Sequence, residues 1–102
     1  MSVQYITLGV DGWHIIVYYN AKPYDKKELY KALRWLDCSR EEALYTLNIA
    51  RRKNTGFTFT NSEYKTSIVC VSHTTSKDQF VSTVVHEAKH VQSHICSFYG
   101  ID

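Results

Sequence analysis

The sequence predicts one α+β domain in which two β-hairpins alternate with helices, in the order ββ-αα-ββ-α. Three observations lead to this prediction. Strand-like runs occur in two pairs, each joined by a short turn. Capping boxes led by Asp or Ser open three helical stretches. The 102 residues contain one proline and four glycines, with no linker or repeat, so we expect a single domain, 1–102, with an antiparallel sheet packed on helices.

The first hairpin is expected at the N-terminus. Val3–Val10 and Trp13–Tyr19 are apolar-rich runs joined through Asp11-Gly12. Asp-Gly between two such runs is a strong signal for a tight hairpin turn. Asn20–Tyr24, which contains the proline, is expected to be a loop.

Two short helices follow this loop. Asp25-Lys26-Lys27-Glu28 begins the first, which ends near Cys38, and Ser39-Arg40-Glu41-Glu42 begins the second, which continues to about Arg52. In each box a short polar side chain can accept a backbone amide of the first turn, while the acidic residue reaches back to the cap. Leucines recur at helical spacing in both stretches, so each helix should have one apolar face.

A second hairpin is expected before the last helix. Phe57–Thr60 alternates strictly between apolar and polar residues, Thr66–Ser72 alternates in part, and Asn61-Ser62-Glu63 forms the turn between them. The second of these strands, extended to Tyr64–Ser72, could be a sheet edge that binds an extended peptide. An ordinary sheet strand is the simpler interpretation.

The last helix is predicted from Ser76 to Tyr99, with a capping box at its start and Gly100 as its C-cap. On a helical wheel its apolar stripe should be buried against the sheet and the two-helix segment. This stripe comprises Val84, Ala88, Val91 and Ile95. A neighbouring face should place polar side chains at the rim of a cleft, namely Thr83, His86, Glu87, His90 and His94.

Within this helix, His86-Glu87-Ala88-Lys89-His90 has the pattern H-E-x-x-H. Histidines four residues apart are about 6 Å apart along the helix axis, so both imidazoles can bind one Zn²⁺ ion. The glutamate beside the first histidine can then act as general base toward the zinc-bound water. We therefore interpret His86 and His90 as zinc ligands and Glu87 as the catalytic base. The alternative is a surface helix that carries histidines by chance.

A catalytic zinc ion usually takes three protein ligands, and this pattern supplies two. His94 continues the four-residue spacing, but it lies about 12 Å from His86 along the helix axis. Each ligand nitrogen must come within about 2.1 Å of the ion, so this geometry argues against His94 as the third ligand. His73 could fold back from the loop before the helix, and Asp102 could approach if the chain end turns back. A residue absent from this chain is the remaining alternative.

Composition excludes several classes of function. The net charge is +2 and no basic run exceeds Arg51-Arg52-Lys53, so nothing indicates nucleic acid; the triplet is most simply a solvated helix end. No apolar run approaches the roughly 20 residues that span a bilayer, and no basic signal-peptide region follows Met1. Three widely spaced cysteines indicate reduced, buried thiols of a cytoplasmic protein: Cys38, Cys70 and Cys96.

The stretch from Thr75 to His90, its apolar continuation to Ile95, and the tail Tyr99-Gly100-Ile101-Asp102 resemble small zincin-like metallopeptidases encoded by phages and prophages. The resemblance covers the C-terminal part of the chain. It implies a zincin-like fold, zinc as cofactor, a peptide or protein substrate, and the H-E-x-x-H roles given above. In such proteins a further helix supplies an acidic third ligand, in the manner of gluzincins. This chain ends where that helix would begin, which implies a truncated or degenerate form.

The leading hypothesis is therefore a zinc metallopeptidase domain with weak zinc binding and little or no activity in this form. The runner-up is a non-enzymatic metal-binding or protein-interaction domain. Without a following helix, apolar surface should be open near Ile95, Phe98 and Tyr99. This predicts either a homodimer contact there or aromatic side chains that fold inward.

Overall fold

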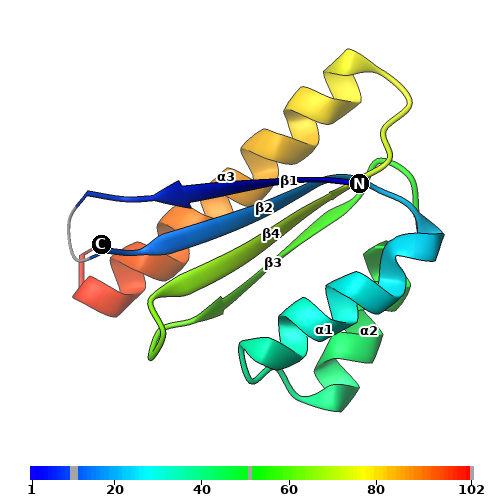
Figure 1. The fold of residues 1–102 in the computed structure, drawn as a ribbon. Coiled ribbons are helices and arrows are strands. Elements are labelled where there is room, and N and C mark those ends of the chain that lie inside the picture. The colour runs from blue at the N-terminus through cyan, green and yellow to red at the C-terminus, as the bar shows by residue number, and fades with distance from the viewer. Residues whose placement is uncertain (10–11, 51, 102) are drawn as a thin grey trace.

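Residues 1–9, 12–50 and 52–101, which the computed structural model describes, form a four-stranded mixed sheet and three α-helices, so the protein is α+β (Figure 1). The strands are β1 (Ser2–Thr7), β2 (His14–Ala21), β3 (Gly56–Asn61) and β4 (Thr66–Ser72). The helices are α1 (Lys26–Trp35), α2 (Arg40–Ala50) and α3 (Lys77–Tyr99), and a 3₁₀ turn, Pro23–Asp25, precedes α1. The strands and α-helices thus follow one another in the predicted order.

The strand order is β1-β2-β4-β3. β1 pairs with β2, and β3 with β4, in antiparallel hairpins as predicted. β2 and β4 pair in parallel, which corrects the prediction of an antiparallel sheet. Parallel neighbours need a long connection, and α1, α2 and β3 provide it. In the first turn Asp11 lies outside the described residues, while Gly12 has a φ of +66°, which glycine adopts without strain.

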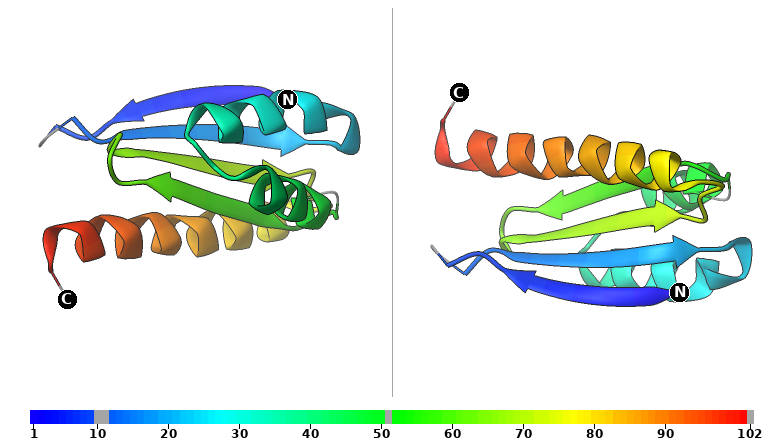
Figure 2. Two further views of the ribbon diagram at one scale, coloured as in Figure 1. Left: turned by 90° about the horizontal axis from the view of Figure 1, so that it is seen from below. Right: turned by 90° about the horizontal axis from the view of Figure 1, so that it is seen from above.

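Helices cover both faces of the sheet: α1 and α2 lie on one face and α3 on the other (Figure 2). Alternation along β4 shows how one strand serves both layers. Ile68 and Cys70 belong to the core beneath α1 and α2, whereas Val69 packs with Val17 and Val91 on the side of α3. β4 is buried along its whole length because it is covered on both faces.

The caps of the helices explain where they begin and end. Ser39 and Ser76 each accept the backbone amide three residues on, at 3.1 Å, as the sequence predicts. Gly100 ends α3 with a φ of +69°. The first box differs from the prediction, because the Asp25 carboxylate accepts the Lys22 amide at 2.9 Å and so caps the 3₁₀ turn rather than α1.

The buried face of α3 matches the predicted apolar stripe only at Val91. Its buried residues are Thr83, Glu87 and Val91, while Val84 and Ile95 are half-buried and Ala88 is exposed. α3 packs mainly on β3 and β4, so the expected contact with the two-helix segment is wrong: the sheet separates the two layers.

The predicted stripe borders an open apolar groove of about 490 Å³. Val84, Ala88 and Ile95 form one wall of this groove, and side chains of the β1–β2 half of the sheet form the other. The groove exists because α3 packs mainly on β3 and β4 and leaves β1 and part of β2 uncovered on its face of the sheet.

The C-terminal aromatic residues fold onto the first hairpin. The ring centroid of Trp13 is 5.4 Å from that of Phe98 and 6.2 Å from that of Tyr99. This packing leaves Trp13 only 1% exposed, while Phe98 and Tyr99 remain 44% and 39% exposed. Both rings therefore pack on Trp13 and bury it but stay exposed themselves, so inward folding, one of the two arrangements expected for these residues, is present only in part.

Candidate metal centre

The H-E-x-x-H segment lies in the middle of α3, and hydrogen bonds fix the loop before this helix to the turn before β3. The Asn54 side chain accepts the Thr75 backbone amide at 2.9 Å and donates to the Thr75 hydroxyl at 3.1 Å. Asn54 itself has a φ of +60°, a conformation that asparagine tolerates better than most residues. These bonds tie the loop before α3 to the turn before β3, which sets where the helix starts.

His86 and His90 meet on the exposed side of α3. Their Nε2 atoms are 3.2 Å apart and their ring centroids 4.7 Å apart. Two nitrogens that each lie about 2.05 Å from a tetrahedral zinc ion are separated by about 3.3 Å. The pair therefore has the spacing that two ligands of one ion require. The same distance also lets one neutral ring donate a hydrogen bond to the other.

Glu87 points from α3 toward the sheet and is only 3% exposed. The Thr58 hydroxyl on β3 donates to its Oε1 at 2.8 Å. Gly56 makes room for this carboxylate, because a Cβ at that position would lie 3.1 Å from Glu87 Oε2 and 2.6 Å from the carbonyl oxygen of Cys70. The glutamate is thus held between the helix and the edge strand of the sheet.

A hollow of about 350 Å³ opens beside this glutamate. It lies between the end of α2, the start of β3 and the first half of α3. His86 and Glu87 both line it, with Ile49, Asn54, Thr55, Gly56, Gln79, Ser82 and Thr83. The first histidine and the glutamate of the motif therefore share one concavity, which is what a metal ligand and a neighbouring base need.

His94 takes part in a different set of contacts. Its Nδ1 is 2.7 Å from the Thr60 hydroxyl, which is 2.8 Å from the Ser67 hydroxyl, and the Trp13 indole donates to Ser67 at 3.2 Å. Burial, and then the charge of His90, lowers the pKa of His94. The ring centroids of His90 and His94 are 6.4 Å apart. These contacts make His94 part of a polar chain between α3 and the sheet.

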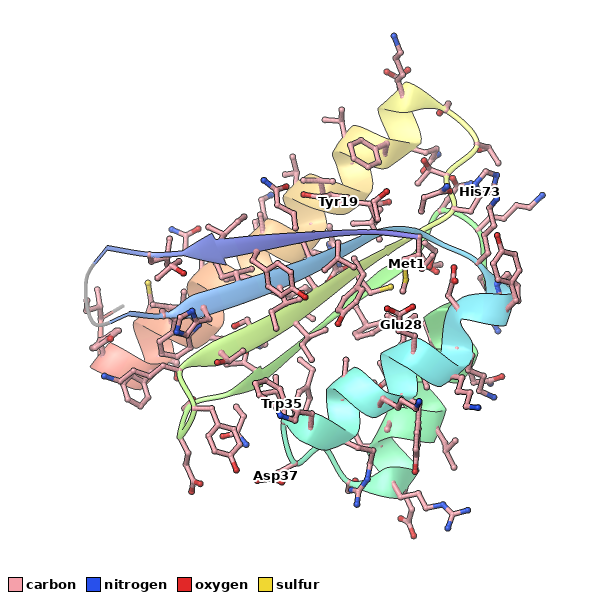
Figure 3. All side chains as sticks on the ribbon, viewed as in Figure 1. Met1, Tyr19, Glu28, Trp35, Asp37 and His73 are labelled. Atoms are coloured by element: carbon pink, nitrogen blue, oxygen red, sulfur yellow. The ribbon has the colours of Figure 1, made fainter. Side chains whose placement is uncertain are left out.

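The other candidates for a third ligand do not complete the site. The Nδ1 of His73 is 2.9 Å from the Asn20 side-chain oxygen, at the end of the sheet (Figure 3). Asp102 lies outside the described residues. Within the described ranges, no three His, Cys, Asp or Glu side chains come close enough to hold a metal ion together. The structure therefore brings His86 and His90 together, places Glu87 in the hollow that His86 lines, and adds no third ligand from this part of the chain.

The edge strand beside α3 is β3, and β4 lies between β2 and β3. The alternative in which Tyr64–Ser72 forms a sheet edge is therefore wrong, and the simpler interpretation, an ordinary sheet strand, is confirmed for Thr66–Ser72. The sequence analysis also missed Thr58, which contacts the glutamate. The alternation of phenylalanine and threonine along β3 was the signal for this contact. Phe57 packs in the core beneath α1 and α2, and Phe59 packs against that core, so the threonines that alternate with them must face α3.

Two expectations from composition can be compared with the structure. Cys38 and Cys70 are free and buried, and Cys96 is free and half-buried, so one of the three thiols is more accessible than expected. Burial, and then the Glu87 charge, raises the pKa of Cys70 to about 12. Among the helices formed by the described residues, none has the length and apolar character needed to cross a membrane.

Comparison of the chain with protein-family models, with curated proteins and with solved structures finds no match in any of the three. The resemblance to zincin-like metallopeptidases therefore depends on the residues from Thr75 to Asp102 themselves. Any role for the histidine pair must be argued from the geometry of α3 and β3.

Proposed function

We propose that this chain is a zincin-like zinc metallopeptidase domain that acts on peptide or protein substrates. The observation that carries the proposal is the convergence of His86 and His90, whose Nε2 atoms are 3.2 Å apart. This separation is close to that of two nitrogen ligands on one tetrahedral zinc ion. Glu87 and His86 line one hollow, which supports a hydrolytic role over simple metal storage.

The residues divide the chemistry between them. Zinc, when bound, supplies a Lewis acid that polarises a carbonyl group and makes water more acidic. His86 and His90 would hold the ion through Nε2. Glu87 would take a proton from the attacking water and deliver it to the leaving amine. Thr58 donates to Oε1 of the glutamate, so Oε2 is the oxygen left for this proton transfer.

A complete catalytic site needs one more protein ligand. Since the described residues bring no third donor to the pair, we place this ligand outside them, at Asp102 or at a residue that this chain lacks. The domain alone should then bind zinc weakly and hydrolyse peptides slowly.

We extend the proposal to the compartment in which the protein works. Its three cysteines are free thiols, and two of them are buried in the fold. Free thiols persist in reducing compartments, so we propose a cytoplasmic location.

A non-enzymatic metal-binding or protein-interaction domain is the second candidate. The burial of Glu87, at 3% exposure, and its bond to Thr58 favour it. A carboxylate that fixes α3 to β3 has a structural role whether or not it also transfers protons. In this alternative the histidines bind metal and the glutamate only stabilises the helix.

Peptidase assays with zinc test the proposal. Fluorogenic peptides of mixed sequence would be incubated with the wild-type chain and with His86→Ala, Glu87→Gln and Lys89→Gln. Removal of a general base typically lowers a rate by about 10²–10⁴-fold, so Glu87→Gln should abolish measurable activity while zinc binding remains. His86→Ala should lose both. Lys89, an exposed residue of the same motif, serves as the matched control and should keep both.

The outcomes separate the two candidates. The proposal requires slow but measurable hydrolysis, so zinc binding without any hydrolysis, by a folded wild-type protein at high enzyme concentration, would support the non-enzymatic domain. Hydrolysis that persists undiminished in Glu87→Gln would remove the glutamate from the mechanism. Absence of zinc binding would reject both candidates.

A further inference from the structure

A second hollow, of about 240 Å³, lies where β2 and β4 end. Cationic and titratable side chains surround it together with an aromatic ring. Its lining includes Lys22, Tyr24, Arg52, Lys53 and His73. None of these residues belongs to the candidate metal centre.

The parallel pairing of β2 and β4 explains how two of these residues come together. Parallel neighbours end at the same edge of a sheet, and the first residues after the two strands are Lys22 and His73. The His73 amide donates to the Ala21 carbonyl at 2.8 Å, which joins the two strand ends (Figure 3). Crevices outside the carboxyl ends of parallel strands are frequent ligand sites.

The remaining cations come from the segment after α2, and hydrogen bonds fix its backbone. The Asn54 amide donates to the His73 carbonyl at 3.0 Å, and the Thr55 hydroxyl donates to the Arg52 carbonyl at 2.7 Å. The backbone at Arg52 and Lys53 is therefore held beside the strand ends before any ligand arrives, and both side chains are exposed. Such preorganisation lowers the entropy lost on binding.

The charges around the hollow are not explained by helix electrostatics alone. Cations suit the C-terminal end of a helix, which accounts for Arg52 and Lys53 after α2. Lys22 and His73 come from strand ends and need another reason. In the described ranges no carboxylate forms an ion pair with Lys22, Arg52 or Lys53; the nearby Asp25 carboxylate accepts a backbone amide.

We propose that this hollow binds a small phosphomonoester whose phosphate is carried on an apolar or aromatic body. Lysine and arginine donate charge-assisted hydrogen bonds to phosphate oxygens. The walls of the hollow are mostly carbon atoms. The Lys22 ammonium lies 5.9 Å from the Tyr24 ring centroid, so a cation and an aromatic face are already adjacent. A volume of 240 Å³ is below the roughly 300–1,000 Å³ of sites for drug-sized ligands, which limits the ligand to a fragment.

Nuclear magnetic resonance titration with phenyl phosphate tests this site. The ¹⁵N-labelled chain would be titrated with EDTA present, so that no metal ion captures the phosphate. We expect a Kd on the order of 1 mM and shifts centred on the amides of Lys22, Lys53 and His73. The double variant Arg52→Gln/Lys53→Gln should weaken binding about tenfold or more, because each cation lost removes a charge-assisted contact.

A matched variant and further ligands complete the test. Lys31→Gln/Lys77→Gln removes the same charge from exposed positions that do not line the hollow, and should leave the Kd within about twofold. Phenol should not bind, and inorganic phosphate should bind more weakly than phenyl phosphate. Vesicles that contain phosphatidic acid identify the source of the phosphate. If the wild-type chain binds these vesicles and the Arg52→Gln/Lys53→Gln variant does not, the phosphate belongs to a lipid headgroup. If the wild-type chain does not bind them, the phosphate belongs to a soluble ligand.

Three results would overturn the site. The first is the absence of shifts at the three amides, and the second is equal weakening by both double variants. The third is tighter binding of a single-stranded oligonucleotide with shifts spread over the surface, since that would indicate general electrostatic attraction.

Discussion

Replacing Thr58 with valine would remove the hydroxyl that ties the edge strand to α3. This hydroxyl donates to Glu87 Oε1 at 2.8 Å, and the glutamate is 3% exposed. Valine matches threonine in shape but cannot donate a hydrogen bond. The variant would therefore leave a buried carboxylate with one partner fewer.

The expected loss follows from the type of bond. Hydrogen bonds to charged groups contribute about 1.5–3 kcal/mol, and Thr58 is only half-buried, so we expect the free energy of unfolding to fall by about 2 kcal/mol. In a domain of 102 residues, 1 kcal/mol corresponds to about 4–8 °C, so Tm should fall by about 8–16 °C. Thr58→Ser keeps the hydroxyl and removes one methyl group, which should cost less than about 1 kcal/mol.

Urea unfolding followed by circular dichroism measures these effects. A double-mutant cycle would combine Thr58→Val with Glu87→Gln and should give a coupling energy of about 1–2 kcal/mol. If Thr58→Val is as stable as Thr58→Ser, or if the coupling is below about 0.3 kcal/mol, then the threonine does not hold the glutamate.

Four further predictions concern the same layers of the fold. Gly56→Ala should lower the free energy of unfolding by at least about 2 kcal/mol, because the new methyl group would lie 2.6 Å from the Cys70 carbonyl oxygen. Urea unfolding measures this loss, and unchanged stability would contradict the close packing. In native protein at pH 7, a thiol reagent should modify Cys96 alone, with three thiols modified after denaturation. Burial raises the pKa of the Cys70 thiol to about 12. The stability that this shift contributes is complete below about pH 8.5, the unfolded value, and should be lost as pH rises toward 12. Unfolding measured at several pH values should show this loss, and Cys70→Ala should diminish it. Val91→Asp should destabilise the domain by about 3 kcal/mol or more, and Val84→Asp, at the open groove, by less, as thermal unfolding can show.

Local patterns in the sequence predicted the elements of the fold, because each depends on neighbouring residues. The serine caps and the alternation in the second hairpin are of this kind. The parallel pairing of β2 with β4 could not be predicted in the same way. It depends on how α1, α2 and β3 return the chain to the sheet, and no local signal distinguishes this from an antiparallel arrangement.

The rotation of α3 about its own axis limited the prediction of the site. Spacing alone placed His86 and His90 on one side of the helix, since residues four apart always share a face. The helical wheel gave an apolar face and a neighbouring polar face, and the prediction placed the apolar face against the sheet. The hydroxyl of Thr58 and the space at Gly56 favour the face of Glu87, and these residues lie about 30 positions away in the chain.

Calorimetric titration of zinc tests the central claim most directly, namely that His86 and His90 form one metal site. We predict one zinc ion per chain with a Kd on the order of 1–100 µM, weaker than complete structural sites, which bind zinc with about 10–16 kcal/mol. Binding should disappear in His86→Ala and in His90→Ala and should persist in His94→Gln, since the His94 ring contacts Thr60 instead. Zinc binding that survives both alanine substitutions, or that is lost equally in His94→Gln, would contradict the claim.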